Sequence, residues 1–243
     1  MAGILSPYGH TLAVRAHCRR TRAGRVREHA RGATITADPP PATIIDQAEA
    51  YARVDPVLLH AMSWAAEFGV TAVGPGAGAA LRLLAATARA RHVVEIGTGT
   101  GVSGLWLLAG MRPDGLLTSI DIEPEHQALA RQSFAAAGFP PGRARLIAGA
   151  ARAMLARLAD NGYDLIFIDG DVTEYPYYVS AAHRLLRAGG LLVINNASGA
   201  GPDVSERESA VLRELVDYLR DAPEWTSTLL AAGTGLLCAV RVP

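Results

Sequence analysis

The chain has 243 residues, of which 50% are hydrophobic, and this is enough apolar material for the single buried core of an ordinary domain. Its 23 basic and 23 acidic residues cancel, so no overall field attracts nucleic acid or an anionic membrane. The two cysteines, Cys18 and Cys238, match neither a disulfide framework nor a metal-binding spacing. Charged residues interrupt every long apolar stretch. We therefore expect a cytoplasmic protein that binds neither membranes nor nucleic acid.

The first 40 residues differ from the rest of the chain. Seven arginines lie between positions 15 and 31 against one acidic residue, Glu28, and Pro39, Pro40 and Pro41 close the segment like a linker. This composition predicts a basic, disordered tail at residues 1–40 and a folded domain at residues 41–243. A basic arm that contacts nucleic acid or a membrane is the alternative. A cleaved signal is disfavoured, because no apolar stretch precedes a small-residue cleavage site.

After the tail, the pattern becomes helical from Thr43. Asp55 and Pro56 form a typical helix start, and Gly69 is a natural end for that helix. The alanine- and leucine-rich residues 76–90 predict a further helix. We therefore expect N-terminal helices before the first strand.

Strands and helices then alternate. Apolar runs predict strands at residues 92–96, 116–121, 144–147, 163–169 and 191–195, and a closing hairpin at 226–230 and 236–241. Helices are expected at residues 102–109, 124–137, 150–158, 177–187 and 205–220. This order predicts an α/β fold with a doubly wound, mostly parallel seven-stranded sheet.

A glycine-rich turn follows the first predicted strand. Gly97, Thr98, Gly99 and Gly101 allow a tight turn and let a ligand approach the backbone closely. Glu95 stands just before this turn, where its carboxylate would repel a diphosphate and attract a cation. S-adenosylmethionine carries a sulfonium and an ammonium group. The motif therefore favours this methyl donor over a dinucleotide.

A dinucleotide site is the alternative interpretation of the same turn. Gly99, Gly101 and Gly104 fit a G-x-G-x-x-G frame, which is a weak signal by itself. Asp121 ends the next strand, where an acid can bind ribose hydroxyls, and both cofactors carry a ribose. A nicotinamide-dependent oxidoreductase therefore remains the alternative enzyme class, although Glu95 and the lack of a Tyr-x-x-x-Lys pair disfavour it.

A second group of polar residues lies at the ends of the fourth and fifth predicted strands. Asp169 ends one strand, and Asn195 and Asn196 end the next. The carboxyl ends of parallel strands share one edge of the sheet, so we expect these side chains to lie together. Such oxygen ligands suit Mg²⁺, which would lower the pKa of an acceptor hydroxyl and orient it. Alternatively, Asp169 caps a turn and the asparagines bind loop backbone.

These motifs, together with residues 120–125, 167–171 and 185–190, resemble the cation-dependent O-methyltransferase family, which contains the caffeoyl-CoA and catechol O-methyltransferases. The resemblance runs from about Thr43 to the C-terminus and is closest to small actinobacterial members. It implies the Rossmann-like fold of S-adenosylmethionine-dependent methyltransferases, a homodimer, and a small phenolic or catechol-like acceptor. Pocket walls are expected near residues 70–76, 171–178 and 198–204.

The resemblance also implies the roles of individual residues. Asp121 would bind the ribose hydroxyls, Ala151 would lie near the adenine, and Asp169 would be the catalytic residue that contacts both donor and metal. The implied donor-binding residues are Glu95, Gly97, Thr98, Gly99, Gly101, Ser103, Asp121, Ile122, Ala151 and Asp169. The implied Mg²⁺ ligands are Asp169, Asn195 and Asn196.

Two positions depart from the family pattern. Asn195 replaces an aspartate, which removes a negative charge and should lower metal affinity. Val172 stands where the family often has a lysine, and valine does no acid–base work. His183 lies within a predicted helix, where a packing or surface role is favoured over catalysis. The sequence thus predicts an O-methyltransferase with weakened metal assistance, and the alternative is a degenerate, non-catalytic dimer that binds the donor.

Overall fold

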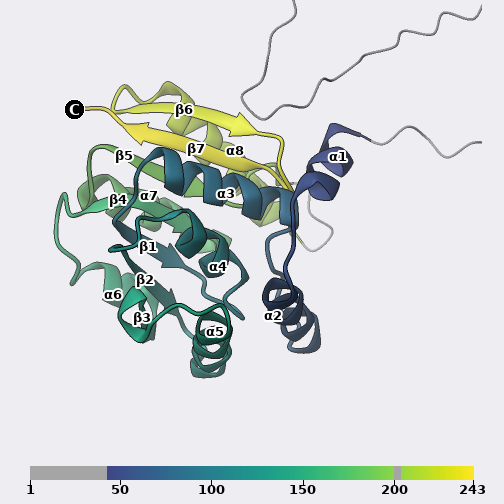
Figure 1. Cartoon of the computed structure of the whole chain (residues 1–243). Coiled ribbons are helices and arrows are strands. Elements are labelled where there is room, and N and C mark those ends of the chain that lie inside the picture. The colour runs from purple at the N-terminus through teal and green to yellow at the C-terminus, as the bar shows by residue number, and fades with distance from the viewer. Residues whose placement is uncertain (1–42, 200–203) are drawn as a thin grey trace, which may run out of the picture. The chain divides into compact units, whose positions relative to one another are not determined.

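The computed structural model describes residues 43–199 and 204–243, so the predicted tail at residues 1–40 lies outside the described residues. The strands form one seven-stranded sheet in the order β3-β2-β1-β4-β5-β7-β6 (Figure 1). They are β1 (His92–Ile96), β2 (Leu116–Asp121), β3 (Ala144–Ala148), β4 (Tyr163–Ile168), β5 (Leu186–Ile194), β6 (Trp225–Leu230) and β7 (Leu236–Arg241). Strands β1 to β5 are parallel, and β7 pairs antiparallel with both β5 and β6. The predicted doubly wound, mostly parallel sheet is confirmed.

The helices precede the sheet or connect its strands. Three come before β1: α1 (Ile44–Tyr51), α2 (Pro56–Glu67) and α3 (Pro75–Thr87). The others are α4 (Val102–Gly110), α5 (Pro124–Ala136), α6 (Ala151–Leu155), α7 (Tyr175–Leu185) and α8 (Glu206–Asp221), with short 3₁₀ turns η1 (Pro141–Arg143) and η2 (Val172–Glu174). Within residues 43–199 and 204–243, no helix combines the length and apolar character that a membrane span needs.

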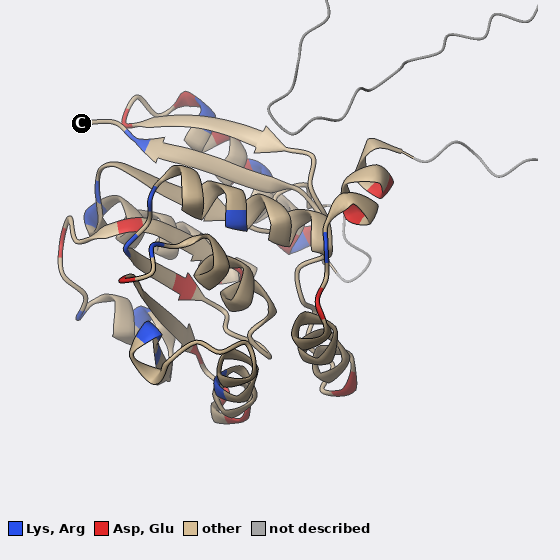
Figure 2. Ribbon diagram, in the orientation of Figure 1, with Lys and Arg blue, Asp and Glu red and all other residues tan. Residues whose placement is uncertain are grey.

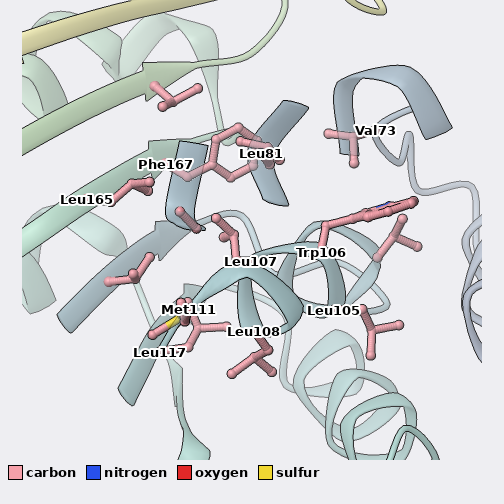
Figure 3. Packing of buried hydrophobic residues seen from close by; sticks show 14 of the residues in the cluster. Val73, Leu81, Leu105, Trp106, Leu107, Leu108, Met111, Leu117, Leu165 and Phe167 are labelled. Carbon is pink, nitrogen blue, oxygen red and sulfur yellow. The ribbon is translucent and has the colours of Figure 1, made fainter. Parts of the chain in front are cut away.

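The sheet separates two hydrophobic clusters. Alternate residues of β4 serve opposite faces: Leu165 and Phe167 pack with α2 to α5, whereas Ile166 and Ile168 pack with α6 to α8. Figure 3 shows the first cluster, which includes Leu81 of α3, Trp106 of α4 and Phe167 of β4. Burial of both faces explains the continuous apolar runs of the parallel strands. Charged residues lie mainly on the helices and loops (Figure 2).

The residues that predict the two ends of α2 take up the expected positions. The Asp55 side chain accepts a hydrogen bond from the backbone N–H of Leu58 and caps α2, with Pro56 in the first turn. Gly69 follows the helix with φ +67°, a conformation that suits glycine.

Some boundaries differ from the predictions. β5 begins at Leu186 rather than at residue 191, because Leu186 pairs with Tyr163 before a register shift carries the ladder on to Leu191. α7 accordingly spans Tyr175–Leu185 rather than residues 177–187. α6 ends at Leu155 instead of residue 158, since Arg157 and Leu158 donate to carbonyls only three residues back, which is a tighter 3₁₀-like turn.

Candidate active site

A cavity of about 460 Å³ opens at the carboxyl ends of β1, β2 and β4. β1 lies between β2 and β4. From β1 the chain adds β2 and β3 on one side of it and then crosses back to add β4 and β5 on the other side, so the topological switch point of the sheet lies between β1 and β4. The cavity is lined by residues 70–73, 96–100, 102–103, 120–123, 126, 149–151, 169–171, 174 and 178. Open α/β sheets bind their ligands at such a position.

The predicted glycine turn forms one wall of the cavity. Gly97 has φ +93°, and a Cβ on it would lie 2.2 Å from the carbonyl oxygen of Asp169. Glycine is therefore required where the turn passes over the end of β4. Gly101 has φ +90° and packs against Ala130 of α5 instead, so it shapes the turn without lining the cavity.

Asp121 ties this turn to the end of β2. One carboxylate oxygen accepts hydrogen bonds of 2.9 Å from the backbone N–H groups of both Thr98 and Gly99. The other accepts from the backbone N–H of Glu123 at 2.9 Å and lies 3.3 Å from Nδ1 of His126. Asp121 therefore fixes the shape of the turn and still lines the cavity.

Glu95 lies behind the cavity wall rather than in it. Its side chain is fully buried, and its two carboxylate oxygens accept from the hydroxyls of Ser103, at 2.6 Å, and Ser119, at 2.5 Å. Burial raises the pKa of Glu95 to about 7, and the two hydroxyl hydrogen bonds oppose that shift. Ser103 lines the cavity, so Glu95 is connected to the cavity through Ser103.

The structure brings Asp169, Asn195 and Asn196 together, as the sequence predicts. Asp169 lines the cavity, and its Oδ1 accepts from Nδ2 of Asn195 at 2.9 Å and from Nδ2 of Asn196 at 3.4 Å. Burial raises the pKa of Asp169 to about 6, and the hydrogen bond from Asn195 opposes that shift. The two asparagines lie behind Asp169 and do not line the cavity.

This donor set does not fit a divalent cation. Mg²⁺ needs oxygen ligands, yet both amides turn their NH₂ groups toward Asp169. The Asp171 carboxylate caps η2 by accepting from the backbone N–H and hydroxyl of Thr173. Within residues 43–199 and 204–243, no three His, Cys, Asp or Glu side chains gather as a metal site would require.

Other sequence expectations can be placed directly. Ile122 and Ala151 line the cavity, and residues from two predicted wall segments, 70–76 and 171–178, do so too. The third wall segment, 198–204, lies partly outside the described residues. Val172 is buried in the core, and the ring of His183 packs 5.7 Å from Trp225, which agrees with a packing role.

Sequence reasoning did not single out Glu123 and His126, which also line the cavity, whereas Tyr178 lies in the predicted wall segment 171–178. Tyr178 of α7 donates a short hydrogen bond to Glu174, the last residue of η2, just before α7 begins. The signal for His126 was its place in the first turn of the helix that follows Asp121. The neighbouring Tyr175 is fully buried and packs in the core.

Comparison with known proteins identifies the family. The sequence profile described as O-methyltransferase matches residues 59–242, which is most of the chain. The chain belongs to this O-methyltransferase family. This membership argues against a nicotinamide-dependent oxidoreductase, because the glycine turn lies within the part of the chain that matches the O-methyltransferase profile.

Individual relatives of this O-methyltransferase agree. A protein from Mycolicibacterium smegmatis, named "Putative O-methyltransferase", is 46% identical over 202 residues, covering 82% of this chain and 96% of the relative. A crystal structure from Corynebacterium glutamicum is 31% identical with a TM-score of 0.74, covering 81% of this chain and 94% of that one. The O-methyltransferase TomG from Streptomyces achromogenes, involved in tomaymycin synthesis and solved with S-adenosylmethionine, is 28% identical with a TM-score of 0.71, covering 79% and 92%.

Proposed function

We propose that the protein transfers a methyl group from S-adenosylmethionine to a hydroxyl group of a small acceptor. The observation that carries this proposal is the convergence of the glycine turn, Asp121, Ser103 and Asp169 on one cavity, in a chain of the O-methyltransferase family. TomG, solved with S-adenosylmethionine, supports the choice of donor.

The cavity offers a matching surface for each part of the donor. Asp121, which lines the cavity, would accept hydrogen bonds from the ribose hydroxyls. Ile122 is 67% exposed at the cavity edge, although large apolar side chains are usually covered, and an adenine ring between Ile122 and Ala151 would cover it. The methionine part would then extend past Gly97 toward Ser103 and Asp169.

Asp169 is the proposed catalytic residue. Its Oδ1 is held by the two asparagines, whereas its Oδ2 makes no hydrogen bond to the described residues, so Oδ2 is available to accept from an acceptor hydroxyl. The acceptor oxygen attacks the methyl carbon as the carbon–sulfur bond breaks, which leaves S-adenosylhomocysteine, and the hydroxyl proton leaves by way of Asp169. Alignment of the two substrates supplies much of the rate in such a displacement.

The charges of the cavity point to the class of acceptor. Asp121, Glu123, Asp169, Asp171 and Glu174 line it together with His126, and none of the described lining residues is an arginine or lysine. Anionic acceptors would meet like charges, whereas neutral or cationic ones would not. The ring of Tyr178 and the side chains of Val70 and Val73 offer apolar contact to an aromatic ring. We propose a neutral or cationic phenol or catechol as acceptor.

A homodimer is part of the proposal. No residue of α1 is buried, and apolar side chains on the N-terminal helices are exposed: Ile44 by 71%, Tyr51 by 88% and Leu59 by 57%. Contact with a second copy would cover this surface. Light scattering coupled to gel filtration measures the mass directly, and a monomer at micromolar concentration would contradict the dimer.

A donor-binding protein without turnover is the second candidate, and the buried, unreactive Val172 favours it. Transfer of a radiolabelled methyl group from S-adenosylmethionine to members of a phenol panel distinguishes the two. Labelled product supports the enzyme. Tight donor binding without product from any neutral, cationic or anionic phenol supports the degenerate protein.

A further inference from the structure

The edge where β4 meets β5 holds a polar cluster that reaches beyond Asp169. Thr234, in the turn between β6 and β7, donates a 2.6 Å hydrogen bond from its hydroxyl to Oδ1 of Asn196. The segment that follows Asn196 is also bound to this turn by two backbone hydrogen bonds. The N–H of Ala197 donates to the carbonyl of Gly235 at 3.1 Å, and the N–H of Ser198 donates to the carbonyl of Thr234 at 3.2 Å. Asn196 has φ +58°, a left-handed conformation that asparagine tolerates better than most residues.

The hydrogen-bonding pattern fixes the orientation of both amides. The Thr234 hydroxyl donates to Oδ1 of Asn196, and the Nδ2 of Asn196 donates to the Asp169 carboxylate, which can only accept. Asn195 is 6% exposed, and its Nδ2 donates to the same carboxylate oxygen. The reverse orientation would place an amide oxygen against a carboxylate oxygen, so that two acceptors would meet without a proton between them.

This arrangement stabilises the ionised form of Asp169 in part. Two N–H groups donate to one oxygen of the carboxylate, and hydrogen bonds to an ionised group are among the stronger ones. A divalent cation would require both amides to rotate and would then face one carboxylate and two neutral oxygens. One oxygen of the nearby Asp171 carboxylate is engaged by Thr173. Glu95 is likewise engaged by Ser103 and Ser119.

We infer that this site works without a divalent metal, and that the amides of Asn195 and Asn196, of which Asn196 is held by Thr234, position Asp169 in place of a cation. The role of Asp169 toward an acceptor rests on the proposed function, but the absence of metal affinity does not. The two asparagines are positioning residues: they hold Oδ1 and leave Oδ2 without a hydrogen bond to the described residues.

Calorimetric titration of Mg²⁺, and separately of Mn²⁺, into chelator-treated protein saturated with S-adenosylhomocysteine tests this inference. We expect no saturable binding of either ion by the wild type up to about 10 mM, which is weaker than the weakest functional Ca²⁺ modules. Electron paramagnetic resonance of Mn²⁺ gives a second readout that does not depend on heat. Saturable binding by the wild type that is lost in Asn196→Ala would overturn the inference.

A matched pair of variants separates charge from space. Asn195→Asp adds a carboxylate without changing side-chain size and should bring in Mn²⁺ binding with a Kd of about 1 mM or tighter, at least about tenfold below the limit of about 10 mM for the wild type. Asn195→Ala opens space without adding charge and should bind no metal. Circular dichroism and the melting temperature report whether each variant folds, and the wild-type titration decides the question even where a variant does not.

The titration of S-adenosylhomocysteine itself reports on the proposed function. If it fails to bind while the wild type also binds no metal, the proposed function is wrong and the metal-free cluster stands. If it binds and Mg²⁺ binds too, the proposed function stands and the inference is overturned. Methyl transfer that continues unchanged in a chelator would agree with both.

Discussion

Ser103 donates a 2.6 Å hydrogen bond to the buried carboxylate of Glu95. One partner lines the cavity and the other lies wholly behind it, so the pair connects a ligand-facing hydroxyl to a fixed acceptor in the core. A hydroxyl whose proton is committed to a carboxylate presents its lone pairs to the cavity. Ser103 is therefore oriented to accept from a donor group such as the ammonium of S-adenosylmethionine.

Ser103→Ala should weaken binding of S-adenosylhomocysteine by about tenfold, since one hydrogen bond to a charged group is worth on the order of 1.5 kcal/mol. Isothermal titration measures the change. Ser227→Ala is the matched control, because Ser227 loses a comparable 2.9 Å hydrogen bond, to the carbonyl of Leu219, on strand β6 and away from the cavity. Equal affinity in the two variants would contradict the role of Ser103.

Glu95 should make the stability of the protein depend on pH. Its folded-state pKa, about 7, lies above the ordinary glutamate value, so the folded state binds the proton more tightly than the unfolded state. This contribution is fully present below about pH 4.5 and is lost as the pH rises to about 7. Asp169, raised to about 6, acts in the same direction. Urea unfolding at intervals from pH 5 to about pH 8 gives the free energy of unfolding at each pH. We expect this free energy to fall less steeply with rising pH in Glu95→Gln than in the wild type.

The role of Glu95 is decided by how steeply the free energy of unfolding changes with pH in the wild type and in Glu95→Gln. A loss of stability that is the same at every pH would mean that Glu95 contributes only packing and neutral hydrogen bonds.

Much of this site could be predicted because strand ends can be recognised in the sequence. Asp121 and Asp169 follow apolar runs directly, and the ends of parallel strands share one edge, so their proximity follows from the topology. Glycines with positive φ, such as Gly97, also have a clear sequence signature after a buried strand. The doubly wound, mostly parallel sheet could be predicted because strands and helices alternate along the chain.

The remaining features depend on contacts between distant segments. Glu95 and Ser119 are register partners in β1 and β2, so the carboxylate turns toward its neighbour strand, and no local pattern indicates this. The amide of Asn196 is oriented by Thr234, 38 residues later in the chain. The early start of β5 likewise depends on pairing between Leu186 and Tyr163.

Asp121→Ala should weaken S-adenosylhomocysteine binding by roughly 100-fold, because it removes the acceptor for the ribose and also frees the backbone N–H groups of Thr98 and Gly99. Titration calorimetry measures the loss. Asp114→Ala is the control, since Asp114 is exposed and pairs with Arg112 before β2. Unchanged affinity in Asp121→Ala would remove the basis for the proposed donor site.

The acidic cavity should select acceptors by charge. Dopamine and dihydroxyphenylacetate share a catechol ring and differ in carrying an ammonium or a carboxylate. We expect kcat/KM to favour dopamine by at least about tenfold at low salt, and added salt to reduce the preference. Glu174→Gln removes a carboxylate that lines the cavity and should reduce the preference for dopamine as well. Glu214→Gln, at an exposed position of α8 away from the cavity, should leave this preference unchanged. A preference for the carboxylate would contradict the proposed acceptor class.

Gly97→Ala should destabilise the fold and the cavity together. The added Cβ would lie 2.2 Å from the carbonyl oxygen of Asp169, and φ +93° is strained for alanine, so we expect a loss of at least about 2 kcal/mol in the free energy of unfolding. Gly142→Ala is the matched control, because nothing lies within 4 Å of a Cβ there. Urea unfolding compares the two variants. If Gly97→Ala were as stable as Gly142→Ala, the turn could not be packed against the end of β4, and Asp169 would lose the neighbour that fixes its backbone.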